Sequence, residues 1–128
     1  ATFSPDGLLV ATSSLDKTAA IWSANTGERL RVLAGHGDFL FCASFSPDGR
    51  SLVTASKDCT ARVWSATSGE CLQVLIGHTY ALLSAAFAPD GLAVVTISYD
   101  YTARIWSAFT GQCVHTLEGH GGLWNTVA

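Results

Sequence analysis

Threonine, aspartate and histidine recur at fixed spacings along this chain. An acyl-transfer enzyme needs the same side chains as nucleophile, orienting carboxylate and general base. A Thr lies four positions before an Asp three times, giving Thr12 and Asp16, Thr54 and Asp58, and Thr96 and Asp100. A nucleophile must also be exposed beside an oxyanion hole. Because a catalytic set gains nothing from being repeated three times, we expect these residues to be structural and the protein not to be an enzyme.

The spacing of these residues is part of a longer internal repeat. The motif FSPDG occurs at residues 3–7 and 45–49, and FAPDG at 87–91, so the period is 42 residues. The blocks 1–42, 43–84 and 85–126 align without a gap, and 17 of the 42 columns hold one residue type in all three. Chance does not produce such agreement, and a fixed period of about 20 to 50 residues is typical of repeat architectures. We therefore expect one segment, 1–128, built from three equivalent units.

Each block has the turn pattern of a four-stranded β-meander. In the second block, short runs rich in Val, Leu, Phe and Thr cover residues 38–45, 50–56, 60–66 and 71–76. The Pro-Asp-Gly sequence at 47–49 is a hairpin turn, because Pro presets its backbone angle, Asp bonds locally and Gly adopts the left-handed conformation. The runs are apolar on both faces, which suits small sheets stacked between others. These features predict an all-β fold.

A Gly-His pair, the FSPDG motif, a Ser-x-Asp-x-Thr motif and a Trp follow one another with this period. The pairs are Gly35-His36, Gly77-His78 and Gly119-His120, and the tryptophans are Trp22, Trp64 and Trp106. The pattern resembles the WD-repeat (WD40-type) β-propeller family over the whole chain. It departs from the family at Ser23, Ser65 and Ser107, where an Asp usually follows the Trp. The resemblance implies a β-propeller arc of three four-stranded antiparallel blades.

The resemblance also implies a buried, hydrogen-bonded tetrad of His, Thr, Asp and Trp in each blade. The two complete sets are His36, Thr54, Asp58 and Trp64, and His78, Thr96, Asp100 and Trp106. The first block has Thr12, Asp16 and Trp22 but no preceding His, whereas His120 has no blade of its own. Such a network leaves no buried polar group unpaired and specifies one arrangement of the sheet.

A display platform for protein partners is the function that the resemblance implies. Partners of the family most often meet the face around the central channel, at positions that correspond here to Phe39, Phe41, Lys57, Ala81, Leu83, Tyr99, Leu15, Leu123 and Asn125. Phe39, Phe41 and Tyr99 stand out because aromatic residues are enriched in interface hot spots. The alternative for Phe41 and Leu83 is that they fill the core between blades. An enzyme with its site at the channel and a purely structural spacer are the two other functions left open.

The number of blades predicts that this segment does not close alone, because propellers close with about 4 to 8 blades. Residues 1–3 match only the tail of a strand, and residues 123–128 match the body of another. We expect either further blades from a longer chain or head-to-tail association of copies, in which two copies make six blades and three make nine. An open arc would expose an apolar sheet face at each end.

Composition and charge exclude several other classes of function. Seven Lys and Arg against ten Asp and Glu give a net charge of −3, and no cluster of cations forms the stripe that nucleic acid requires. Charged residues interrupt each apolar run before the roughly 18 residues that a membrane helix needs. The cysteines Cys42, Cys59, Cys71 and Cys113 lack zinc spacing. We therefore expect free thiols, no metal or cofactor, and a reducing location in the cytoplasm or nucleus.

Overall fold

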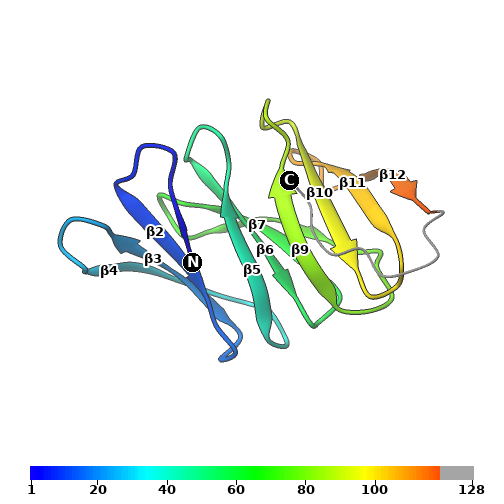
Figure 1. Ribbon diagram of the computed structural model, residues 1–128, viewed down its shortest axis with the longest axis horizontal. Helices are drawn as coiled ribbons and strands as arrows, with labels where there is room; N and C mark the ends of the chain where they lie inside the picture. Colours follow the sequence, from blue (N-terminus) through cyan, green and yellow to red (C-terminus); the bar gives the residue numbers. More distant parts are fainter. Residues whose placement is uncertain (119–128) are drawn as a thin grey trace.

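The computed structural model describes residues 1–118, which form three four-stranded antiparallel sheets (Figure 1). The first sheet contains β1 (Thr2–Phe3), β2 (Leu9–Ser13), β3 (Thr18–Ser23) and β4 (Arg29–Ala34). The second contains β5 (Leu40–Phe45), β6 (Ser51–Ser56), β7 (Ala61–Ser65) and β8 (Cys71–Leu75). The third contains β9 (Leu82–Phe87), β10 (Ala93–Ser98), β11 (Ala103–Ser107) and β12 (Cys113–Leu117). Strands pair in chain order within each sheet, so each sheet is a meander, which confirms the all-β prediction.

The turn between β5 and β6 shows how the sequence sets the strand ends. Asp48 Oδ1 accepts hydrogen bonds from the Ser46 hydroxyl at 2.6 Å and from the backbone N–H of Arg50 at 2.9 Å. Gly49 has a φ of 73°, a left-handed conformation that residues with a Cβ rarely adopt. The Pro-Asp-Gly motif therefore reverses the chain after the first strand of the sheet.

Residues 1–118 contain no helix long and apolar enough to cross a membrane.

The sheets stack face to face, and the side chains between them form two hydrophobic clusters. Between the first and second sheets lie Ile21, Leu33, Leu40, Leu52 and Trp64, among others. Between the second and third sheets lie Val53, Leu75, Leu82, Val94 and Trp106, among others. The middle sheet is covered on both faces, and five of the six residues of β6 are buried. This two-sided burial accounts for the lack of a simple apolar and polar alternation in its strands.

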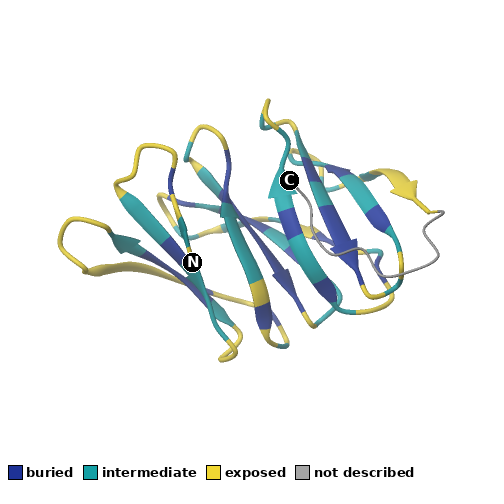
Figure 2. Ribbon diagram, viewed as in Figure 1, coloured by how far each residue is buried: buried dark blue, intermediate teal, exposed yellow. Residues whose placement is uncertain are grey.

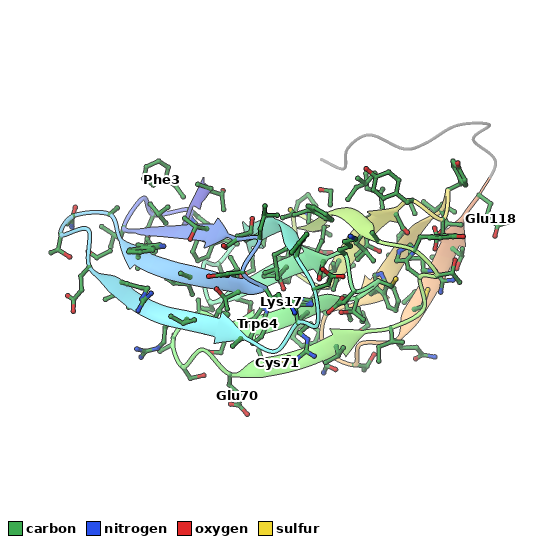
Figure 3. All side chains as sticks on the ribbon, turned by 90° about the horizontal axis from the view of Figure 1, so that it is seen from below. Phe3, Lys17, Trp64, Glu70, Cys71 and Glu118 are labelled. Carbon is green, nitrogen blue, oxygen red and sulfur yellow. The ribbon has the colours of Figure 1, made fainter. Side chains whose placement is uncertain are left out.

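The described sheets, packed face to face, fan out in an open arc and do not close into a ring (Figure 1). β5 packs against β2 of the first sheet and β9 of the third, so the first strands lie on the inner side of the arc. The last strands lie outermost: β4 is exposed at five of six positions and β12 at four of five (Figure 2). Figure 3 shows Trp64 among the sheets, whereas Phe3 and Glu70 point away from them.

Candidate functional site

Four side chains of the second sheet form a continuous hydrogen-bonded network. His36 lies in the connection between β4 and β5, with Nδ1 2.8 Å from Asp58 Oδ2 and Nε2 2.7 Å from Thr54 Oγ1. The Nε1–H of Trp64 donates to the same Thr54 oxygen at 2.9 Å. Asp58 Oδ2 also accepts the backbone N–H of Gly37 at 3.0 Å. The network therefore ties the connection to β6, to β7 and to the turn between them.

The third sheet repeats this geometry. His78 Nδ1 lies 2.7 Å from Asp100 Oδ2, and its Nε2 lies 2.8 Å from Thr96 Oγ1. The Nε1–H of Trp106 donates to Thr96 at 2.8 Å, and the backbone N–H of Thr79 donates to Asp100 at 3.2 Å. The second and third sheets thus each bring together one complete set of His, Thr, Asp and Trp.

The hydrogen-bond partners of both histidines fit an imidazole that is neutral at pH 7 and carries its proton on Nδ1. Burial lowers the pKa of His36 and of His78 below the ordinary value, although the bond to the carboxylate acts in the opposite direction. A carboxylate only accepts hydrogen bonds, so Nδ1 donates to the Asp and Nε2 accepts the proton of the Thr hydroxyl. The Thr oxygen in turn accepts from the Trp. Each donor in the set has an acceptor, which is the condition for burying it without a penalty.

The carboxylate of Asp100 is ionised over a wide pH range. Burial by itself would raise its pKa, but hydrogen bonds from Thr102, His78 and Thr79 outweigh burial and lower the pKa to about 2. The equivalent contacts lower the pKa of Asp58 despite its burial. Both carboxylates therefore remain good acceptors for the imidazole proton.

The network presents no exposed nucleophile. Thr54 and Thr96 are fully buried, and each hydroxyl already donates to a histidine and accepts from a tryptophan. An acyl-transfer nucleophile has to be reachable beside an oxyanion hole. The arrangement consequently fixes the backbone connection and offers no group for attack on a substrate.

The first sheet holds part of the same network. The Nε1–H of Trp22 donates to Thr12 at 2.9 Å, and Asp16 Oδ1 accepts from the hydroxyl of Thr18 at 2.6 Å and from its backbone N–H at 3.0 Å. Thr12, Asp16 and Trp22 line a cavity of about 360 Å³. His120, which the family resemblance relates to these three residues across a blade junction, lies outside the described residues.

A pocket of about 610 Å³ lies between the second and third sheets. Its lining residues are Phe39, Phe41, Lys57, Tyr80, Ala81, Tyr99 and Tyr101. They come from the connections that lead into β5 and β9, from β5 itself, and from the β6–β7 and β10–β11 turns. In an antiparallel meander, the start of the first strand and the turn between the second and third strands lie at the same end of the sheet. The fold therefore gathers these segments at one end of two neighbouring blades.

A β-bulge near the start of β5 places Phe41 in the pocket lining. Leu40 pairs with Ser56 and Cys42 pairs with Ala55, so Phe41 is an extra residue without a partner in β6. The bulge breaks the alternation of the strand. As a result Leu40, 3% exposed, enters the core, whereas Phe41 is 44% exposed.

Backbone hydrogen bonds fix the two walls of the pocket. On one wall, the carbonyl of Phe39 accepts the N–H of Lys57 at 2.8 Å and the hydroxyl of Ser56 at 2.8 Å. On the other wall, the N–H of Tyr99 donates to the carbonyl of Ala81 at 3.0 Å. The Lys57 ammonium lies 5.4 Å from the centroid of the Phe39 ring, within the range of a cation–π contact.

The pocket brings together five of the nine residues predicted to contact partners: Phe39, Phe41, Lys57, Ala81 and Tyr99. Leu83, the extra residue of the equivalent bulge in β9, is partly buried and lies outside the pocket lining. Neither Phe41 nor Leu83 belongs to a core cluster, because Leu40 and Leu82 occupy those places. Leu15 is exposed on the turn between β2 and β3, and Leu123 and Asn125 lie outside the described residues.

Two pocket residues, Tyr80 and Tyr101, were not among the residues predicted from the sequence. Tyr80 is 64% exposed and Tyr101 is 59% exposed, and Tyr101 occupies a turn position with a φ of 67°. The aligned column of Tyr101 contains Lys17 and Cys59 in the other blocks. Both tyrosines lie in columns where the other blocks have different residue types. An aromatic residue in such a variable loop column is the sequence signal that would have found them.

Comparison with known proteins agrees with this geometry. A family model described as "WD40: WD domain, G-beta repeat" matches residues 1–23, 27–65 and 69–107, which together make up more than half of the chain. The chain belongs to the WD40 repeat family. A solved structure titled "Structure of U3-55K" matches this WD40 chain with a TM-score of 0.90 and 25% sequence identity. No curated protein sequence matches it.

The WD40 chain is short relative to that solved structure. The match covers 95% of this chain but 39% of the other one. The similarity therefore confirms the arrangement of blades predicted from the family resemblance.

Within residues 1–118, no group of three or more His, Cys, Asp or Glu is arranged to hold a metal ion. The four cysteines are free thiols.

Proposed function

We propose that this WD40 protein is a non-enzymatic scaffold for protein–protein interaction, and that the pocket between the second and third blades binds a protein or peptide partner. WD40 repeats imply an interaction scaffold as the kind of function. The observation that supports the specific site is the convergence of five exposed aromatic side chains on one cavity: Phe39, Phe41, Tyr80, Tyr99 and Tyr101. Single exposed apolar residues are ordinary, but a contiguous group marks an interaction surface. Aromatic residues also dominate interface hot spots.

The rigidity of the pocket walls supports the same proposal. Phe39 is tied to Lys57, and Ala81 to Tyr99, by backbone hydrogen bonds. Binding residues are commonly found on loops that a rigid scaffold positions. A preformed site loses little conformational freedom when a partner binds, which favours affinity.

The absence of enzymatic activity is part of the proposal. Its support is the complete burial of Thr54 and Thr96, the hydroxyl residues of the two sets that also contain a His and an Asp. A spacer without a partner at the pocket is the competing function.

Affinity capture with a triple variant tests the binding site. Replacing Phe39, Phe41 and Tyr99 by Ala should remove captured partners while the far-UV circular dichroism spectrum and the unfolding midpoint stay close to those of the wild type. The control replaces Phe3, Leu8 and Phe109 by Ala, which are exposed apolar residues outside the pocket lining. Equal capture by wild type, triple variant and control would show that partners bind elsewhere or not at all.

We further propose that the three blades act as part of a closed propeller, completed by blades of a longer chain or by other copies. The open arrangement of the described sheets supports this proposal, as does the cavity beside Thr12, Asp16 and Trp22 in the first blade. Two copies joined head to tail would supply six blades and three copies nine. The free thiols support a location in the cytoplasm or nucleus.

A further inference from the structure

Of the described residues that line the aromatic pocket, Lys57 alone is charged. Its ammonium lies over the ring of Phe39, at 5.4 Å from the centroid. It forms no ion pair with a carboxylate of residues 1–118, where the ion pairs are those of His36 with Asp58 and of His78 with Asp100. The Lys57 ammonium is therefore available to pair with a carboxylate of a ligand.

The acidic residues closest in sequence to the pocket are engaged within the protein. The Asp58 side chain is 16% exposed and that of Asp100 is 7% exposed, and both carboxylates accept hydrogen bonds from the tetrad. Asp38 Oδ1 accepts the backbone N–H of Phe39 at 2.8 Å, and Asp38 does not line the pocket. Lys57 is therefore the charge that a ligand in the pocket would meet.

We propose that the pocket binds a protein segment in which a bulky apolar side chain is flanked by Asp or Glu. This inference rests on the proposed function and adds the chemistry of the partner. The apolar side chain would enter the aromatic cavity, whose 610 Å³ lies within the range of about 300 to 1,000 Å³ that is usual for ligand pockets. The flanking carboxylate would pair with Lys57. Charge complementarity of this kind sets specificity and the rate of association.

The hydroxyl groups of two lining tyrosines add to this chemistry. Tyr80 is 64% exposed and Tyr99 is 46% exposed, so a ligand in the pocket can reach their hydroxyl groups, which can donate to a carboxylate or to a peptide carbonyl. A cationic ligand is the competing occupant. It is supported by the negative charges of Asp58, Asp100 and Asp38. Burial is the largest cause that raises the pKa of the Cys59 thiol, and these three charges raise that pKa further.

Selection of short random peptides displayed on phage tests the inference on the full chain. Four proteins are used as bait: the wild type, Lys57→Glu, the triple Ala variant at Phe39, Phe41 and Tyr99, and Lys17→Glu. The last is a matched control, because it makes the same charge change on the exposed turn of the first blade, outside the pocket. Circular dichroism and the unfolding midpoint establish that each bait is folded.

We expect the wild type and Lys17→Glu to enrich the same peptides, in which Asp or Glu lies beside Phe, Trp or Leu. A synthetic peptide of that sequence should bind Lys57→Glu at least about tenfold more weakly, and its affinity for the wild type should fall as salt increases. Lys57→Glu should enrich peptides with Lys or Arg instead.

Two other results would count against the inference in different ways. If the enriched peptides are lost with the triple variant but carry Lys, Arg or no charge, the pocket is a binding site and the acidic partner is wrong. If the triple variant enriches the same peptides as the wild type, or if no peptide is enriched, the proposed function fails together with the inference.

Discussion

Asp58 Oδ2 lies 2.8 Å from Nδ1 of His36, although 22 residues separate the two in the chain. Lys57 precedes this Asp, and Phe39 follows this His by three positions. The bond therefore holds together the two segments that form one wall of the aromatic pocket. The equivalent bond in the next blade does the same for the segments that carry Tyr80, Tyr99 and Tyr101. The buried networks thus support the surface that we propose as the binding site.

Replacing Asp58 by Ala should destabilise the protein by about 2 to 4 kcal/mol, because the buried imidazole of His36 and the N–H of Gly37 lose their acceptor. The free energy of unfolding from urea titration measures this loss. Asp90→Ala is the matched control, since Asp90 is exposed and its side chain bonds only within its own turn among the described residues. It should cost under about 1 kcal/mol. Equal effects at both positions would contradict the role given to the tetrad.

Acid should destabilise the fold in two stages. The pKa values of His36 and His78 are lowered in the folded protein, so only the unfolded chain takes up protons as the pH falls below the ordinary value of 6.5. Their contribution to stability is complete above that pH and declines below it. Asp100, with its pKa lowered from 3.8 to about 2, adds a second loss between those two values. Urea midpoints that are the same at pH 8 and pH 5 would contradict the first stage.

Gly35→Ala should destabilise the second blade by about 1 to 3 kcal/mol through overpacking. A Cβ at Gly35 would lie 2.6 Å from Nη1 of Arg62, and the φ of 152° disfavours side chains. Arg62 would have to leave its position over the Trp64 ring, where its guanidinium lies 5.9 Å from the ring centroid. Gly37→Ala serves as the control, since the nearest atom to its Cβ would be 3.9 Å away. Thermal unfolding of both variants should show a lowered midpoint for Gly35→Ala alone.

Size-exclusion chromatography with light scattering should show the isolated chain as a dimer, trimer or larger species. The described sheets form an open arc, and apolar residues such as Leu30 and Val32 of β4 are exposed in the first blade. Patches of this kind are covered in stable soluble proteins. A single monomeric species at micromolar concentration would contradict the proposal that other copies complete the ring.

The fold was predictable because the turns repeat with a fixed period. Runs predicted at 38–45 and 71–76 correspond to β5 (Leu40–Phe45) and β8 (Cys71–Leu75). The Pro-Asp-Gly motif sets the first hairpin of each blade by local hydrogen bonds, so it needs no information from distant residues. The residues of the tetrads came from the family resemblance, which relates side chains far apart in the sequence.

The pocket was only partly predictable. Whether Phe41 faces the core or the surface depends on a bulge between Leu40 and Cys42. No residue type in the sequence indicates a bulge at that position. Strict alternation would exchange Leu40 and Phe41 between core and surface. The variable turn columns of Tyr80 and Tyr101 indicate exposed aromatic residues. That the two meet in one pocket depends on how two blades pack together, which no local pattern predicts.

The bulge at Phe41 allows a residue of the proposed binding surface to change without a change in the residues that stabilise the fold. Phe41 is left out of the strand pairing and out of both core clusters, so a replacement there would alter the proposed binding surface at little cost to folding. Leu83 occupies the same extra position in β9. A chain built from such blades carries one interchangeable side chain in each of these strands, and duplication of blades multiplies the combinations that selection can sample.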